Sequence, residues 1–197
     1  MTASTSRRAV LAATLFAPAI ARAQGDYPAR PITIISAGAA GGPTDTITRI
    51  VADALGRQLP QPVVVEATGG SLVAPQKLVN SRPDGYTLMN QNVGLTAAAT
   101  LYRRLPFAMP GAFAPLGLVS DAAMTVVSRP NFPARDMAEL MATLKREGET
   151  LNLATAGLSS AANLCGLLLQ QAAGARATTV VFRGTGPAIS EVLADRI

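Results

Sequence analysis

The sequence feature that most constrains the fold is a glycine-rich stretch, Gly38-Ala39-Ala40-Gly41-Gly42-Pro43-Thr44-Asp45. It follows a short apolar run at residues 32–36, and apolar residues recur with helical spacing from Ile47 onward. Pro43 suits the first position of a helix, because its missing N–H would have no partner there, and Asp45 complements the positive end of the helix dipole. The sequence therefore predicts a buried strand, a glycine loop and a helix from Pro43 to about Gln58.

This helix start is a candidate site for an anion. The first N–H groups of a helix have no partner within it, and here they point into a loop that has few side chains. The hydroxyls of Thr44 and Thr46 lie beside them in the sequence. A glycine turn before a helix is also an ordinary way for a chain to change direction, so this stretch alone leaves both interpretations open.

Residues 1–23 have the pattern of an export signal. Ser6-Arg7-Arg8 is basic, residues 9–21 carry no charge, and Ala21-Arg22-Ala23 has the form of a cleavage site. We expect a periplasmic protein with this signal removed and with no membrane-spanning helix. The arginine pair resembles a twin-arginine signal with Val10 in place of the usual Phe, so ordinary secretion and twin-arginine export both stay open.

Composition argues against several classes of function. Without Arg7, Arg8 and Arg22, the 17 basic residues fall to 14 against 12 acidic ones, a net charge of +2. With 4% aromatic residues and no basic cluster, we expect no nucleic-acid partner. The chain has no histidine, which removes Ser-His catalysis and the commonest zinc ligand. We therefore expect no enzyme activity, no metal site and no cofactor, and a buried role for Cys165, the single cysteine.

Strand and helix patterns alternate along the chain. Strands are predicted at residues 32–36, 63–66, 86–90, 116–120, 124–128, 151–156 and 178–182. Helices are predicted at residues 43–58, 71–81 and 96–103, after the cap residue Asp136, after residues 157–160 and after residues 184–187. A strand, a helix and a strand at such short spacing indicate a right-handed crossover and a parallel sheet. The boundary between two lobes is predicted near residues 121–123, which gives lobes of residues 24–122 and 123–197.

Three of these helices have apolar residues spaced to form one buried face each. In chain order, the sets are Ile47, Ile50, Val51, Ala54 and Leu55; Leu164, Leu167 and Leu168; and Ile189, Val192 and Leu193. We expect these faces to pack on the sheets.

Three strands lead through small and hydroxylated residues into a helix, at residues 41–45, 157–160 and 184–187. Ligands of open α/β sheets bind at the carboxyl ends of the strands, so we expect the three loops to meet at one cleft. A small carboxylate is the natural ligand for the helix starts and hydroxyls there. Strand-to-helix turns without any ligand remain the alternative.

Several stretches in this order carry a family resemblance. They are Tyr27-Pro28-Ala29-Arg30-Pro31-Ile32, Ala39-Ala40-Gly41-Gly42-Pro43-Thr44-Asp45, Val63-Val64-Val65-Glu66, Pro83-Asp84-Gly85-Tyr86-Thr87-Leu88 and Phe182-Arg183-Gly184-Thr185-Gly186-Pro187-Ala188. Together they resemble the Bug (TctC-like) family of periplasmic solute receptors of tripartite tricarboxylate transporters. The resemblance implies an α/β, two-lobed periplasmic-binding-protein fold of type II, the Venus flytrap. It also implies a monomeric receptor, not an enzyme, that delivers a small carboxylic acid to a membrane permease.

The resemblance also implies a set of ligand contacts from the first glycine loop and from two loops of the second lobe. On this chain the set is Gly41, Gly42, Thr44, Asp45, Ser159, Ser160, Asn163, Gly184 and Thr185. For Asp45, a helix-start role and a ligand-contact role both stay open. Two departures lie near the site: Ala67-Thr68-Gly69-Gly70 replaces the usual Asn and Pro-Gly-rich loop, and Asn163 stands where the family often has His. The identity of the acid is therefore not carried over.

Two rival functions and one expectation about length remain. A dinucleotide-dependent oxidoreductase needs G-x-G-x-x-G, whereas Gly38, Gly41 and Gly42 have a different spacing, although Glu66 suits the acidic position. A receptor-like remnant or interaction module without binding is the second rival. Family members are longer, and the apolar pattern still runs at Ile197, so we expect the second lobe and its return to the first lobe to be incomplete.

Overall fold

The structure is a computed structural model that describes residues 26–69 and 72–197. The predicted signal peptide and the Gly70-Ser71 start of the second predicted helix lie outside the described residues. In chain order the elements are β1 (Ile32–Ser36), α2 (Pro43–Gly56), β2 (Val63–Ala67), α3 (Val73–Val79), β3 (Thr87–Asn90), α4 (Gly94–Leu101), α5 (Met137–Glu147), the 3-10 helix η2 (Gly148–Thr150), β4 (Asn152–Thr155), α6 (Ala161–Ala173), β5 (Thr178–Val181) and α7 (Thr185–Leu193). Among the helices in the described ranges, none is both long and apolar enough to cross a membrane.

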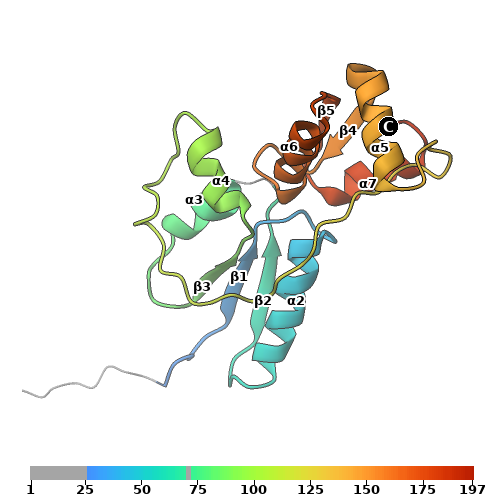
Figure 1. The fold of residues 1–197 in the computed structure, drawn as a ribbon. Helices are drawn as coiled ribbons and strands as arrows, with labels where there is room; N and C mark the ends of the chain where they lie inside the picture. Colours follow the sequence, from blue (N-terminus) through green and yellow to red (C-terminus); the bar gives the residue numbers. More distant parts are fainter. Residues whose placement is uncertain (1–25, 70–71) are drawn as a thin grey trace, which may run out of the picture.

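The elements form two parallel sheets, which confirms the predicted α/β class. The first sheet has the order β2-β1-β3, with Ile34 opposite Val65 on one side and Leu88 on the other. The second sheet pairs β4 with β5. Figure 1 shows each sheet with its own helices, so the chain has the two-lobed arrangement predicted from the sequence. β1 is the central strand of the first lobe, and Ile32 and Ile35 on it are almost wholly buried.

The buried face of α2 differs from the predicted one. Asp45, Thr48 and Ala52 are its buried residues, whereas Ile50 is 64% exposed. The short loop after β1 fixes the rotation of the helix, because the Asp45 carboxylate turns back to the Gly41 N–H at 2.9 Å. This rotation puts Thr48 against the sheet, where its hydroxyl accepts a hydrogen bond from Asn90 at 2.9 Å. Loop geometry therefore overrides the apolar pattern in this helix.

The predicted inward faces of α6 and α7 are also partly wrong. Leu167 and Leu168 are exposed on α6, and Leu193 is exposed on α7. The buried residues of α6 include Gly166, on which a Cβ atom would lie 2.8 Å from Leu153 Cδ2. A small residue thus lets α6 lie directly on β4, and the leucines turn toward solvent.

The strands predicted at residues 116–120 and 124–128 are absent. Residues 114–128 are irregular, and no backbone hydrogen bond joins them to any other described residue. Leu116 and Leu118 are 82% and 88% exposed. A strand exists only as part of a ladder, so an apolar pattern without a neighbouring strand stays extended and unpaired. In Figure 1 this segment runs as a long connection from the first lobe to the second. The lobe boundary predicted at residues 121–123 falls within it and stays a prediction.

The other predicted strands and helices are present. Where the sequence predicted the end of an element, the observed end differs by at most two residues.

The N-terminal segment is tied to the turn before β3. The Tyr27 hydroxyl donates to the Gly85 carbonyl at 2.7 Å, and the Ala29 N–H donates to the Tyr86 hydroxyl at 2.8 Å. The Arg30 guanidinium lies 3.9 Å from the centre of the Tyr86 ring. Two of the stretches that carry the family resemblance are therefore held against each other.

The two lobes touch at two glycines, Gly184 and Gly94, where an added side chain would overlap the other lobe. A Cβ atom on Gly184 would lie 2.7 Å from the Cβ of Ala39, and Gly184 has φ +153°, which favours glycine. A Cβ atom on Gly94, at the start of α4, would lie 2.7 Å from the Ser159 carbonyl oxygen. Loops of the first lobe therefore meet loops of the second lobe directly.

We predict that Gly184→Ala lowers the free energy of unfolding by about 1–3 kcal/mol, because it combines backbone strain with overlap against Ala39. Urea denaturation followed by circular dichroism measures the change. Gly111→Ala is the matched control, since nothing lies within 4 Å of the added Cβ atom. Equal stability of the two variants would show that the lobes do not meet in this way.

Candidate functional site

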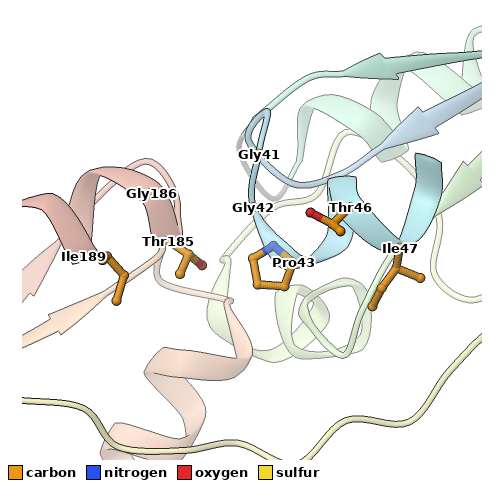
Figure 2. Close-up of a pocket in the computed structure, with 8 residues that line it drawn as sticks. All are labelled: Gly41, Gly42, Pro43, Thr46, Ile47, Thr185, Gly186 and Ile189. Atoms are coloured by element: carbon orange, nitrogen blue, oxygen red, sulfur yellow. The ribbon is translucent and has the colours of Figure 1, made fainter. Parts of the chain in front are cut away.

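A cavity of about 510 Å³ lies between the first turns of α2 and α7. It is lined by Gly41, Gly42, Pro43, Thr46, Ile47, Thr185, Gly186 and Ile189. Figure 2 shows Pro43 and Thr185 facing each other across it, with Gly41 and Gly42 along one border. Each lobe therefore contributes one helix start to the same cavity.

The two helices at the cavity lack side-chain caps. Glycine occupies the cap position of both, Gly42 for α2 and Gly184 for α7, and neither helix has a side-chain hydrogen bond at its cap. By contrast, α5 is capped by Asp136 and α6 by Ser160. Uncapped N–H groups at a helix start, together with the positive end of the dipole, favour an anion.

Asp45 organises the first of these helix starts. The residue is 1% exposed, and its Oδ2 atom accepts hydrogen bonds from Gly41 N–H and from Arg49 Nε, each at 2.9 Å. Burial raises the pKa of Asp45, but the hydrogen bonds from Arg49 and Gly41 and the charge of Arg49 outweigh it and hold the pKa below the ordinary value. Its Oδ1 atom is buried and has no hydrogen-bond partner among the described residues. The carboxylate thus closes the glycine loop and keeps one acceptor unused.

Asn92 joins the glycine loop to α4, and the sequence prediction missed it. Its Nδ2 atom donates to Thr44 Oγ1 at 3.3 Å, and its Oδ1 atom accepts from Gly94 N–H at 2.9 Å. The residue follows the end of β3, where polar side chains of an α/β sheet commonly serve a site, and this position was the available signal. Asn92 therefore positions Thr44 beside the cavity.

The loop before α6 is largely satisfied by its own groups. Ser160 Oγ accepts from Asn163 N–H at 3.1 Å and donates to the Gly157 carbonyl at 2.7 Å. The Asn163 side chain donates to the Leu158 carbonyl at 2.6 Å. Ser159 is fully buried, and within residues 26–69 and 72–197 its hydroxyl has no hydrogen-bond partner. Ser160 and Asn163 thus shape the loop, while Ser159 keeps an unused hydroxyl.

The structure brings part of the predicted set to the cavity. Gly41, Gly42 and Thr185 line it, whereas Thr44, Asp45, Ser159, Ser160, Asn163 and Gly184 do not. For all nine residues, ligand contact stays a prediction. Outside that set, Pro43 and Gly186 also line the cavity and belong to the loops that were expected to meet there, and Thr46 belongs to the candidate anion site. Ile47 and Ile189 line it and were not predicted. They lie about one helical turn after the two glycine starts, so counting one turn onward from each start would have found them.

The described part of the chain contains no group of three or more His, Cys, Asp or Glu residues that is placed to hold a metal ion. The eight described residues that line the cavity are all uncharged. The arrangement offers backbone donors, hydroxyls and apolar surface.

We predict that Asp45→Asn lowers the free energy of unfolding at pH 6 by about 1 kcal/mol, a modest value because Arg49 is more than half exposed and solvent screens its charge. A depressed pKa means that the stabilisation is complete above the ordinary Asp value of 3.8 and is lost as the pH falls through the lower folded-state value. The difference between the two proteins should therefore shrink below about pH 3.8, as measured by urea denaturation at several pH values.

Asp53→Asn is the matched control, because Asp53 pairs with Arg57 four residues on, with both side chains exposed. Such a pair contributes little to stability. An advantage of the unmodified protein over Asp45→Asn that grows toward low pH would contradict the assignment.

Comparison with known proteins agrees with this fold. A UPF0065 protein from the TAR-I ttuE-ttuC' intergenic region of Agrobacterium vitis is 38% identical over 192 residues, which cover 96% of this chain and 55% of the relative. The solved structure of the periplasmic binding protein BugD matches with a TM-score of 0.77 and 32% identity, over 87% of this chain and 58% of that one. MatC from Rhodopseudomonas palustris, solved with bound malate, matches with a TM-score of 0.78 and 31% identity, over 84% of this chain and 57% of that one.

The chain thus spans less than two thirds of the length of these relatives. The family model of the tripartite tricarboxylate transporter family receptor, TctC, matches residues 47–197. This range includes α2 from Ile47 onward, the second lobe and both loops of the second lobe that were predicted to form the site. The lobed α/β fold and this match together show that the chain belongs to the TctC receptor family.

Proposed function

We propose that the chain is the binding region of a periplasmic solute receptor for a small carboxylic acid. The observation that carries the proposal is the pair of uncapped helix starts, α2 from one lobe and α7 from the other, at one cavity. Two positive dipole ends and the hydroxyls of Thr46 and Thr185 suit a carboxylate. Malate in the related MatC structure supports this ligand class.

We also propose that the receptor is a monomer, that it delivers the acid to a membrane permease, and that it catalyses no reaction. Membership of a transporter receptor family supports the permease partner. Binding between two lobes suits a receptor that closes on its ligand and releases it when the lobes separate. Catalysis is not part of the proposal, because the uncharged lining offers no group to move a proton at neutral pH.

We predict that calorimetry detects binding of at least one acid from a panel of C3 to C6 mono-, di- and tricarboxylates. A ligand at 100 times its Kd should also raise the free energy of unfolding by about 2.7 kcal/mol, which thermal shift detects. Heat with NAD or FAD but none with the acids would favour the oxidoreductase. No binding of any of these compounds would favour the remnant.

We also predict that Thr185→Val weakens binding of the acid about tenfold, since it removes a hydroxyl that can donate to the carboxylate and keeps the side-chain shape. Thr100→Val is the control, because Thr100 is an exposed residue of α4 away from the cavity. Equal affinities of the two variants would remove Thr185 from the site.

The role of Asp45 is decided by the same binding measurement. Unchanged affinity of Asp45→Asn with lowered stability would assign Asp45 to the loop alone. A loss of tenfold or more for an acid that carries a hydroxyl or amino group would assign Asp45 to the ligand, because the Oδ1 atom can accept from such a group or from a bridging water.

A further inference from the structure

We propose that the cavity selects an acid with one carboxylate and an aliphatic chain over acids with several carboxylates or hydroxyls. The inference rests on the proposed function and names the ligand class of the same site. Two observations carry it: an apolar wall opposite the glycine loop, and a positive potential that matches about one negative charge.

The apolar wall is built by Ile47 from α2 and Ile189 from α7, with the Pro43 ring beside them. Figure 2 shows Ile189 and Ile47 at opposite ends of the cavity, with Thr185 and Pro43 between them and both isoleucine side chains directed away from Gly41. Ile189 is 37% exposed, so it presents apolar surface that water now contacts. A methylene chain lying between these side chains would remove that surface from water.

The rotation of α2 explains why Ile47 is available for this wall. Asp45, Thr48 and Ala52 occupy the face of α2 that meets the sheet, and this leaves Ile47 on an adjacent face. Ile50, one turn further, faces solvent and does not line the cavity. The two isoleucines of the same helix therefore provide a test residue and a control.

The charge of the site limits the number of carboxylates. Each helix start carries roughly half a positive charge, so α2 and α7 together supply at most about one, and the Asp45 carboxylate in the first turn of α2 offsets part of it. The described residues that line the cavity include no Lys or Arg, and Arg49 is engaged by Asp45. A second carboxylate on the ligand would lie against Ile47 and Ile189 without a counter-charge, and a hydroxyl there would lose its hydrogen bonds to water.

Isothermal titration calorimetry on the full 197-residue chain tests the inference, with acetate, butanoate, hexanoate, malate and citrate as probes. We expect the affinity to rise about fourfold for each added methylene group, hence roughly fifteenfold from butanoate to hexanoate. Malate and citrate should bind more weakly than hexanoate. Tighter binding of malate or citrate, or affinity independent of chain length, would overturn the inference while leaving the proposed function in place.

Ile47→Ala and Ile189→Ala should each reduce hexanoate affinity about tenfold and leave acetate affinity within twofold. Ile50→Ala and Leu193→Ala, at exposed positions of the same helices outside the cavity lining, should change neither. Equal losses in test and control variants would also overturn the inference. The chain-length series on the unmodified protein decides the matter if a variant fails to fold. Binding of no acid at all would overturn the proposed function and this inference with it.

Discussion

The site depends on close contacts between the two lobes at two glycines, Gly184 and Gly94. Gly184 approaches Ala39 so closely that no Cβ atom fits between them, and Gly94 approaches Ser159 in the same way. These contacts set the distance between the starts of α2 and α7, and therefore the width of the cavity between those helices. Closely packed atoms yield little, so the lobes can approach this closely only because Gly184 and Gly94 have no side chain.

A second constraint acts within the first lobe and fixes the rotation of α2. The buried Asp45 carboxylate bonds to the Gly41 N–H and to Arg49, and this ties the glycine loop to the first turn of the helix. Burying a carboxylate is costly unless charged and hydrogen-bonding partners offset the loss of water, and both kinds are present here. One consequence is that Asp45, Thr48 and Ala52, not the isoleucines, face the sheet. The other is that Ile47 is free to line the cavity.

The chemistry of the cavity follows from what its helix starts lack. Asp136 and Ser160 cap the starts of α5 and α6, and neither helix lines the cavity. The two helices that line it, α2 and α7, have glycine at the cap position and no side-chain cap. In the proposed receptor, this arrangement would hold an anion through backbone N–H groups and hydroxyls, which carry no full charge. Membership of a transporter receptor family also supports the proposed ligand site, and the chain spans less than two thirds of the length of its relatives.

The sequence by itself determined the alternation of strands and helices, the parallel sheets, the helix starts at Pro43 and Thr185, and the family. These features depend on local rules: glycine and proline positions, cap residues and short apolar runs. The tertiary structure decided which face of each helix is buried, because loop lengths and close backbone contacts turned α2 and α6 away from the faces that their apolar residues indicate. It also decided that residues 116–128 form no strands, since a strand needs a neighbour that a local pattern does not reveal. Likewise, Gly41 and Thr185 were recognisable from their motifs, whereas Ile189 lines the cavity only because the two lobes meet there. Asn92 reaches Thr44 only because β3 pairs with β1 in the first sheet.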